Sequence, residues 1–149
     1  MKPIMLASPP IMYPPIEAAL RKLKMICPGE IGSFAIADCW DSALFFEHLG
    51  GCGYRRRRCE SYDSLSLTFI DGACCWHTDP GFGLVACWLI YNENSSGDEP
   101  QLITRHGPLN VKEGDLFIFN ADQGHAWVSN GACVMVMATI AKQRQGVAA

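Results

Sequence analysis

The sequence has no apolar run long enough to cross a membrane. Its longest runs, such as residues 84–91, fall far short of the roughly 20 residues that a spanning helix needs. Prolines at positions 3, 9, 10, 14 and 15 interrupt the apolar N-terminal stretch, so we find no continuous signal-peptide core there. We therefore expect a cytoplasmic protein that does not insert into a membrane.

The cysteine spacing that is typical of zinc sites is also missing. The chain has 8 cysteines, and no two of them form a C-x-x-C pair. Structural zinc sites usually contain such pairs. Because thiols stay reduced in the cytoplasm, we expect most of these cysteines to be small, buried, apolar residues and not disulfides or zinc ligands.

Charged residues are scarce, at 18% of the chain, and the formal net charge is -3. An acidic chain of this kind is not a general nucleic-acid binder. The one concentrated charge is the run from Arg55 to Arg58. Such a run either receives an anion, such as a phosphate or a carboxylate substrate, or protects a strand edge against pairing with another chain.

The size and the hydrophobic content predict one folded domain, 1–149. The chain has 149 residues, of which 49% are hydrophobic, and this is enough to bury a core. Residues 15–24 combine an initial proline with good helix formers and basic residues at the end, which predicts a short helix. We expect a second helix with Asp38 as its N-cap and Gly50 and Gly51 as its stop, so that residues 15–50 form a helical buttress.

From residue 62 onward the pattern changes to short runs rich in β-formers, separated by glycine, proline, asparagine and aspartate. Turn residues lie between the runs, for example at Asp71-Gly72 and at 94–97. Eight antiparallel strands of this kind predict a mainly β jelly roll with its core in residues 62–141. We expect strands over residues 62–70, 73–78, 84–91, 101–104, 108–111, 115–119, 125–129 and 132–141.

A pattern of potential metal ligands lies within these strands. The triplet His77-Thr78-Asp79 is followed, 46 residues after the aspartate, by His125. Side chains two positions apart on a strand point to the same side, so His77 and Asp79 can reach one point while Thr78 faces away. If the strand that starts at His125 lies beside the strand that ends at Thr78, His125 supplies a third ligand. His48 and His106 have no partner at ligand spacing, and we do not propose them as ligands.

Two histidines and one carboxylate on one face leave the other coordination positions of an ion open. This arrangement suits non-haem Fe(II), because substrate and O2 can bind the same ion. It is the design of a catalytic metal site and not of a structural one. An alternative interpretation is that the three residues are ordinary polar side chains at strand ends, bonded to backbone or water.

The second half of the chain resembles the Fe(II)/2-oxoglutarate-dependent oxygenase superfamily, especially its prolyl-hydroxylase-like branch. The matching pieces are the H-x-D triplet at 77–79, an apolar strand ending at 89–92, an acidic glycine turn at 96–99, and residues 111–119 leading into His125. The resemblance implies a double-stranded β-helix in which the second and seventh strands are neighbours and the N-terminal helices buttress the larger sheet. It implies that His77, Asp79 and His125 are catalytic and hold Fe(II), with 2-oxoglutarate as cosubstrate.

Members of this family usually hold the distal carboxylate of 2-oxoglutarate with an arginine or lysine on the eighth strand, in a G-x-R step. Here that step reads Gly-Ala-Cys at 131–133, and no basic residue lies between His125 and Lys142. The charge-assisted anchor is therefore missing from its usual place. Some relatives take the basic residue from the fourth strand, where Arg105 is the nearest candidate for cofactor binding by position. The alternative for Arg105 is a solvated loop residue.

Three functions remain open at this point. The first is an Fe(II) oxygenase that uses 2-oxoglutarate to hydroxylate a small-molecule or peptide substrate. The second is a cupin-like metalloenzyme that does not use 2-oxoglutarate and whose substrate coordinates the metal, since residues 114–130 resemble the second cupin motif. The third is a non-catalytic jelly-roll module that binds a protein or nucleic acid. Because so short a chain has little room for substrate-binding insertions, a homodimer could complete the site.

Overall fold

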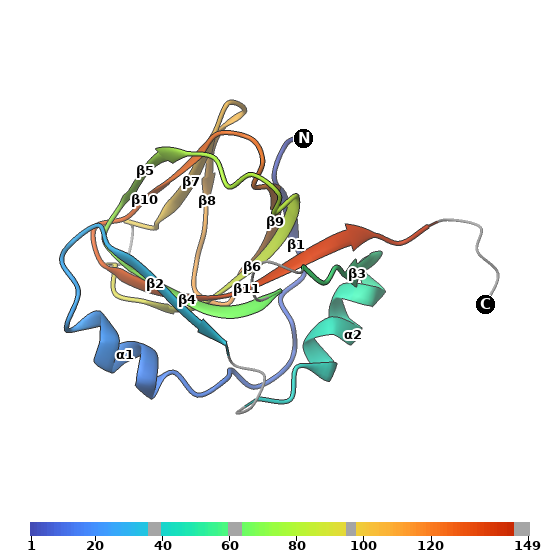
Figure 1. Ribbon diagram of the computed structural model, residues 1–149, viewed down its shortest axis with the longest axis horizontal. Coiled ribbons are helices and arrows are strands. Elements are labelled where there is room, and N and C mark those ends of the chain that lie inside the picture. The colour runs from blue at the N-terminus through green and yellow to red at the C-terminus, as the bar shows by residue number, and fades with distance from the viewer. Residues whose placement is uncertain (36–39, 60–63, 95–97, 145–149) are drawn as a thin grey trace.

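The computed structural model describes residues 1–35, 40–59, 64–94 and 98–144. Two helices and eleven strands lie in these residues, so the chain is mainly β (Figure 1). The helices are α1 (Glu17–Leu23) and α2 (Ala43–Gly51). The strands are β1 (Ile4–Leu6), β2 (Ile31–Ala35), β3 (Tyr54–Arg56), β4 (Leu65–Asp71), β5 (Cys74–His77), β6 (Leu84–Asn92), β7 (Gln101–Thr104), β8 (Gly107–Asn110), β9 (Leu116–Asn120), β10 (His125–Val128) and β11 (Ala132–Lys142).

The strands form two antiparallel sheets that face each other. The larger sheet has the order β1-β9-β6-β11-β4-β2, and β3 pairs with the last residues of β11. The smaller sheet has the order β5-β10-β7-β8. Consecutive strands of the chain thus alternate between sheets in several places, and β5 and β10, far apart in the sequence, become neighbours.

Burial of both faces of β6 explains why its sequence is apolar without interruption. In an antiparallel sheet with one wet face, every second residue is polar, whereas a strand covered on both faces is apolar throughout. Both faces of β6 are covered. Its even-numbered residues pack in the cluster that includes the helices, and its odd-numbered residues pack in the cluster between the sheets: Ala86, Trp88 and Ile90 on one side, Val85, Cys87 and Leu89 on the other.

Both helices lie against the outer face of the larger sheet, on the side away from the smaller sheet (Figure 1). Phe45 of α2 is fully buried there, and its ring stacks on the Trp88 ring with centroids 5.7 Å apart. The Trp88 indole N–H donates to the backbone carbonyl of Gly114 at 3.2 Å, which satisfies its one polar group. This outer layer leaves the space between the sheets free for a site.

Each of the eight expected strands overlaps an observed strand, with ends that agree or are shifted by a few residues. The expected first strand begins at Tyr62, and Tyr62 lies outside the described residues, as does most of the turn expected at 94–97. Eight strands, β4 to β11, lie after residue 62, and β1, β2 and β3 are three further strands that were not expected. These three strands pair with β9, β4 and β11, and their own sequences carry too short or too mixed a pattern to be recognised without the partner strand.

The ends of the helices also differ from the expected ones. The second helix begins at Ala43 after Ser42, and the expected N-cap Asp38 lies outside the described residues. Gly50 and Gly51 do not stop the helix, since both are in or at the end of α2. The residue that reverses the chain is Gly53, whose φ of 93° lies in the left-handed region that glycine adopts without strain.

No helix in the described part of the chain is both long and apolar enough to span a membrane. This agrees with the short apolar runs of the sequence.

The packing of α2 against the larger sheet predicts a contrast between two adjacent residues. Phe45→Ala is expected to lower the free energy of unfolding by about 3–5 kcal/mol, because it empties a fully buried site against Trp88. Leu44→Ala, at a position 56% exposed, is expected to change it by no more than about 0.5 kcal/mol. Urea unfolding of both variants measures the difference, and equal losses would contradict this packing.

Candidate metal centre

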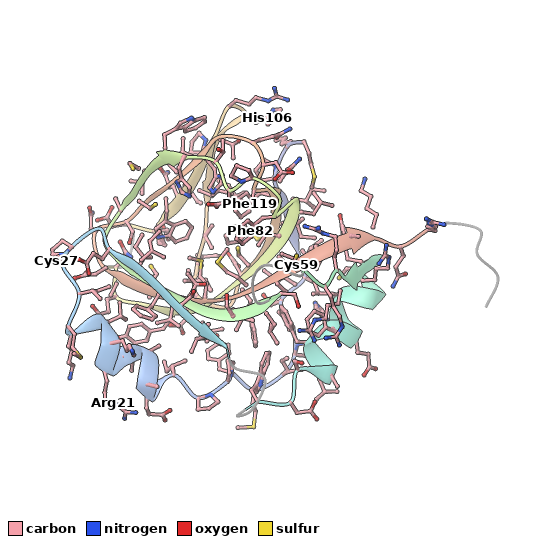
Figure 2. The ribbon with its side chains drawn as sticks, viewed as in Figure 1. Arg21, Cys27, Cys59, Phe82, His106 and Phe119 are labelled. Carbon is pink, nitrogen blue, oxygen red and sulfur yellow. The ribbon has the colours of Figure 1, made fainter. Side chains whose placement is uncertain are left out.

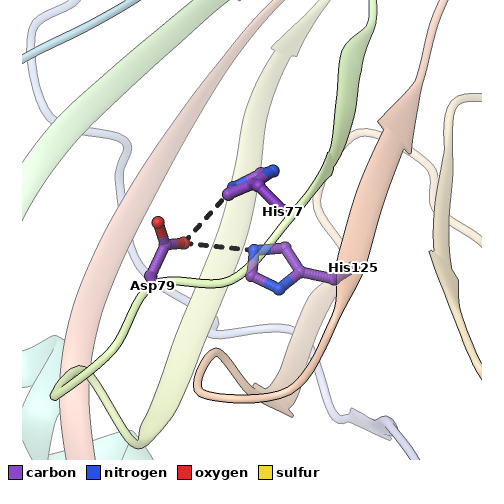
Figure 3. A group of neighbouring side chains, drawn as sticks. All are labelled: His77, Asp79 and His125. Carbon is purple, nitrogen blue, oxygen red and sulfur yellow. Dashed lines mark hydrogen bonds and ion pairs between the residues drawn. The ribbon is translucent and has the colours of Figure 1, made fainter.

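The pairing of β5 with β10 brings two histidines from distant parts of the chain together. His77 is the last residue of β5 and His125 the first residue of β10, and the two are direct partners in the antiparallel register. Their ring centroids are 4.3 Å apart. Asp79 follows two residues after His77, and its carboxylate faces both rings (Figure 3). The expectation that the second and seventh strands are neighbours is therefore confirmed.

One ligand atom from each of the three residues lies within 4.8 Å of the others. The Asp79 Oδ2 oxygen is 3.1 Å from Nε2 of His125 and 3.4 Å from Nε2 of His77. Two donors bound at right angles about 2.1 Å from one ion are about 3 Å apart. The spacing thus fits a shared divalent ion, and Thr78 between the ligands is exposed, as expected.

The other nitrogen of each imidazole is already committed to the backbone. His77 Nδ1 lies 2.7 Å from the carbonyl oxygen of Cys75, and His125 Nδ1 lies 2.8 Å from that of Gln123. A carbonyl oxygen only accepts, so both Nδ1 atoms must carry the proton and donate. In the neutral rings, Nε2 then has a lone pair, and this is the tautomer that metal-binding histidines adopt.

Both Nε2 lone pairs point at a carboxylate oxygen, which is also an acceptor. Three electron-rich atoms that face one another repel unless positive charge lies between them. Either a cation or additional protons on the rings supply that charge. A divalent cation satisfies all three groups at once, and the residues present fit such an ion.

A β-bulge in β5 turns the required side chains toward the interior. His77 pairs with His125 and Cys74 pairs with Trp127, so three steps on β5 match two on β10. The extra residue breaks the strict alternation, and both Cys74 and His77 line the interior while Cys75 and Trp76 are exposed. Bulges commonly redirect a side chain next to a functional site.

The loop that carries Asp79 is held by backbone and side-chain hydrogen bonds. The Asp79 N–H donates to the Ala121 carbonyl at 2.9 Å, and Asp122 Oδ1 accepts from the Gly81 N–H at 2.8 Å. From the other side, the Arg57 guanidinium donates to the carbonyls of Gly81, at 3.1 Å, and Phe82. The ligand loop is therefore fixed at both of its sides, and the carboxylate of Asp79 keeps its position facing the two histidines.

A cavity of about 450 Å³ opens beside these three residues, between the two sheets. Volumes of this size accommodate small organic molecules. Phe82 and Phe119, which Figure 2 shows inside the barrel, line the cavity, and the Phe119 ring meets the His125 ring edge-on at 4.8 Å. Most of the remaining lining is apolar, except for a row of hydroxyl groups. Among the described residues that line the cavity, Asp79 is the only acid, and no lysine or arginine occurs.

Two thiols contribute to the wall of the cavity near the histidines. Burial raises the pKa of the Cys74 thiol, and neighbouring Cys75 and Asp79 raise it further. Burial also raises the pKa of the Cys87 thiol, with Asp79 adding to the shift. Both groups therefore stay neutral near pH 7 and form part of the apolar wall.

The structure does not bring Arg105 to the cavity. This residue is exposed in the turn between β7 and β8, and its Nε lies 3.4 Å from Nε2 of the neighbouring His106. Figure 2 shows His106 at the outer tip of that turn. His48 lies at the end of α2, where Nε2 is 2.7 Å from the carbonyl of Ala7. Neither His48 nor His106 belongs to the metal-ligand group.

Sequence reasoning missed Arg57 and Asp122, which hold the Asp79 loop. Nothing in the run Arg55 to Arg58 distinguishes Arg57 from its neighbours, because the difference arises only when β3 pairs with β11. Arg55, in β3, and Arg58, just after it, are exposed. Arg56 and Arg57 instead bond inward.

Comparisons with known proteins agree with the fold. A prolyl-4-hydroxylase from Pseudomonas putida aligns with a TM-score of 0.55 at 12% identity, over 95% of this chain and 92% of that chain. A cupin superfamily protein from Desulfitobacterium hafniense aligns over 93% of this chain and 98% of that chain, at 14% identity and a TM-score of 0.46. No protein-family model matches the sequence, and no curated protein matches it. The likeness to the hydroxylase is one of fold.

The geometry predicts that His77 and His125 are both needed for tight metal binding. Wild-type protein is expected to bind one Mn(II), and His77→Ala or His125→Ala to weaken binding at least about 100-fold, because two ligands cannot hold the ion as three do. The matched control is His106→Ala, which is expected to bind as the wild type does. Titration calorimetry on metal-free protein measures all four affinities. Undiminished binding after loss of His125 would contradict the site.

Arg57 is not a metal ligand, but its hydrogen bonds to the loop that carries Asp79 predict that its loss weakens metal binding. Arg57→Met is expected to weaken Mn(II) binding about 10-fold, because the loop that carries Asp79 loses its outer support. Arg55→Met changes an exposed arginine two residues earlier in the chain and is expected to leave the affinity unchanged. The same titration tests both variants. If Arg57→Met binds like Arg55→Met, the loop does not depend on this guanidinium.

Proposed function

We propose that this chain is a non-haem Fe(II)-dependent oxygenase built on a double-stranded β-helix, with His77, Asp79 and His125 as iron ligands. The observation that carries the proposal is the convergence of Nε2 of both histidines on one carboxylate oxygen beside a cavity, with each Nδ1 next to a backbone carbonyl. The sheet orders β9-β6-β11-β4 and β5-β10-β7-β8 support the assignment of the barrel. The fold of the Pseudomonas putida prolyl-4-hydroxylase supports it further.

The donor set favours an open catalytic metal site, such as an iron site, over a structural zinc site or a calcium site. Two imidazoles and one carboxylate suit an ion that keeps other positions open, whereas structural zinc sites are closed by four protein ligands and calcium prefers oxygen donors alone. Bound Fe(II) would supply O2 activation and open positions for substrate. The chain's own part is to orient the ligands and to exclude water.

Several contacts serve that orienting role. The carbonyls of Cys75 and Gln123 accept from Nδ1 of the two histidines and orient both rings, so that Nε2 of each ring faces the metal position. The Phe119 ring fixes the plane of the His125 imidazole. Apolar residues surround most of the cavity, and this limits the access of water to the reacting groups.

We propose 2-oxoglutarate as the cosubstrate, held in the cavity with its oxo-acid end toward the metal. The volume of about 450 Å³ leaves room for so small a molecule. Arg105, the partner expected from the sequence, lies outside the cavity. The distal carboxylate of 2-oxoglutarate would therefore need a different partner.

A second candidate is a cupin-like metalloenzyme without 2-oxoglutarate, whose substrate itself coordinates the metal. The observation in its favour is that no basic residue occurs among the described residues lining the cavity. The two candidates share the metal and the barrel and differ in the cosubstrate. A non-catalytic binding module is the third possibility, and it predicts that metal binding is dispensable.

The proposal predicts turnover that depends on both iron and His125. Wild-type protein with Fe(II), ascorbate and O2 is expected to convert 2-oxoglutarate to succinate and CO2, slowly even without substrate. His125→Ala is expected to lose at least about 100-fold of that rate, because iron is no longer held. Arg105→Met serves as the control and is expected to retain the wild-type rate. Succinate is quantified by mass spectrometry. Tight metal binding with no binding of 2-oxoglutarate would exclude this cosubstrate and leave the cupin-like candidate.

A further inference from the structure

A row of hydroxyl groups lines one wall of the cavity. Ser64, Ser66 and Thr68 lie at every second position along and just before β4, so their side chains share one face of the strand, and all three line the cavity. Ser64 and Thr68 are each only 8% exposed. Buried hydroxyl groups need hydrogen-bond partners, so an otherwise apolar cavity with such a wall indicates a ligand that carries oxygen atoms.

Ser64 is distinguished from the others by its contact with Arg56. The Nε and Nη2 atoms of Arg56 lie 3.1 and 2.9 Å from Ser64 Oγ, and both donate to it. A serine oxygen has two lone pairs, and Arg56 occupies both. The hydroxyl proton of Ser64 must therefore be donated elsewhere. Within the described ranges no group accepts it, and the cavity is the space that the residue lines.

The next two hydroxyls are also left with a proton. Ser66 Oγ and Thr68 Oγ1 are 3.2 Å apart, and one of them donates to the other. The accepting group keeps its own proton, which no described group accepts. Ser64, Ser66 and Thr68 together thus offer more donors than the protein itself uses.

The charge of Arg56 adds a preference for an anion. Arg56 pairs with Ile140 in the register of β3 and β11, and its guanidinium carbon lies 4.8 Å from the centroid of the Phe46 ring. No carboxylate in the described part of the chain lies within ion-pair distance of it. Burial lowers the pKa of Arg56, and the nearby charge of Arg58 lowers it further.

We propose that Ser64, polarised by Arg56, donates a hydrogen bond to the carboxylate of a small organic acid that occupies the cavity. The opposite end of the acid faces His77, Asp79 and His125. A hydrogen bond to a charged acceptor is stronger than one to a neutral acceptor, and two guanidinium donors behind the hydroxyl strengthen it further. Ser64 and Arg56 take the place of a basic residue on β11 and of Arg105. This inference rests on the proposed function only for the end of the acid that faces the metal ligands.

The same carboxylate chemistry has two sources, the distal group of 2-oxoglutarate or the acid group of a substrate that itself coordinates the metal. The experiment has one arm for each. The first arm compares 2-oxoglutarate with 2-oxopentanoate, which has the same chain length and a methyl group in place of the distal carboxylate. The second arm compares benzoate and hexanoate with their primary amides.

All affinities are measured by calorimetry without O2 on Mn(II)-loaded wild type, Ser64→Ala, Arg56→Gln and Ser33→Ala. Ser33 is the matched control, because it lines the same cavity and no arginine donates to it in the described residues. Wild type and Ser33→Ala are expected to prefer the acid about 10-fold or more. Ser64→Ala and Arg56→Gln are expected to lose that preference, with the affinity for the neutral probe unchanged. Thermal unfolding checks that each variant is folded. If Arg56→Gln does not fold, the comparison of wild type with Ser64→Ala decides the test.

A Ser64-dependent preference in the first arm identifies the cosubstrate as the source, and one in the second arm alone identifies the substrate. A wild type without preference in either arm, or a preference that survives Ser64→Ala, overturns the proposal. Failure of the proposed function is separate, because it would be seen as absent Mn(II) binding in the same samples. The second arm would then still test Ser64 on metal-free protein.

Discussion

The convergence of two imidazole nitrogens and one carboxylate oxygen is the constraint on which the site depends. The backbone carbonyls of Cys75 and Gln123 accept from Nδ1 of the two histidines, so Nε2 of each ring faces the carboxylate of Asp79, and in neutral rings these Nε2 atoms carry lone pairs. Such an arrangement is unfavourable by itself and favourable around a cation. The barrel maintains it through the β5–β10 register, the bulge in β5 and the hydrogen bonds that hold the Asp79 loop.

The cavity beside this centre has two chemically different ends. One end carries the histidines and Asp79, and the β4 wall carries hydroxyls with unused protons next to an arginine. A molecule that binds a metal at one end and presents oxygen atoms at the other matches both. The arginine run, which in the sequence is a uniform block of charge, is thereby divided: Arg57 supports the ligand loop and Arg56 lies behind Ser64.

The parts of the fold that could be predicted from the sequence are those in which local pattern and final environment agree. β6 and β11 bury both faces, and their long apolar runs are visible in the sequence, as is the turn with Asp71-Gly72. The edge strands β1 and β3 could not be predicted, because pairing with β9 and β11 and not their own residues makes them strands. The spacing of His77, Asp79 and His125 was sufficient to group them, since strand parity and one neighbour relation determine where they meet. The position of Arg105 could not be predicted, because the number of residues between a loop residue and its strand does not determine where its side chain points.

The most direct test is a crystal structure of the protein grown with Mn(II) without O2, in which anomalous scattering locates the ion. The account predicts one ion about 2.0–2.3 Å from Nε2 of His77, Nε2 of His125 and a carboxylate oxygen of Asp79. An ion bound elsewhere, or imidazoles that keep their present contacts with no ion between them at saturating Mn(II), would contradict it.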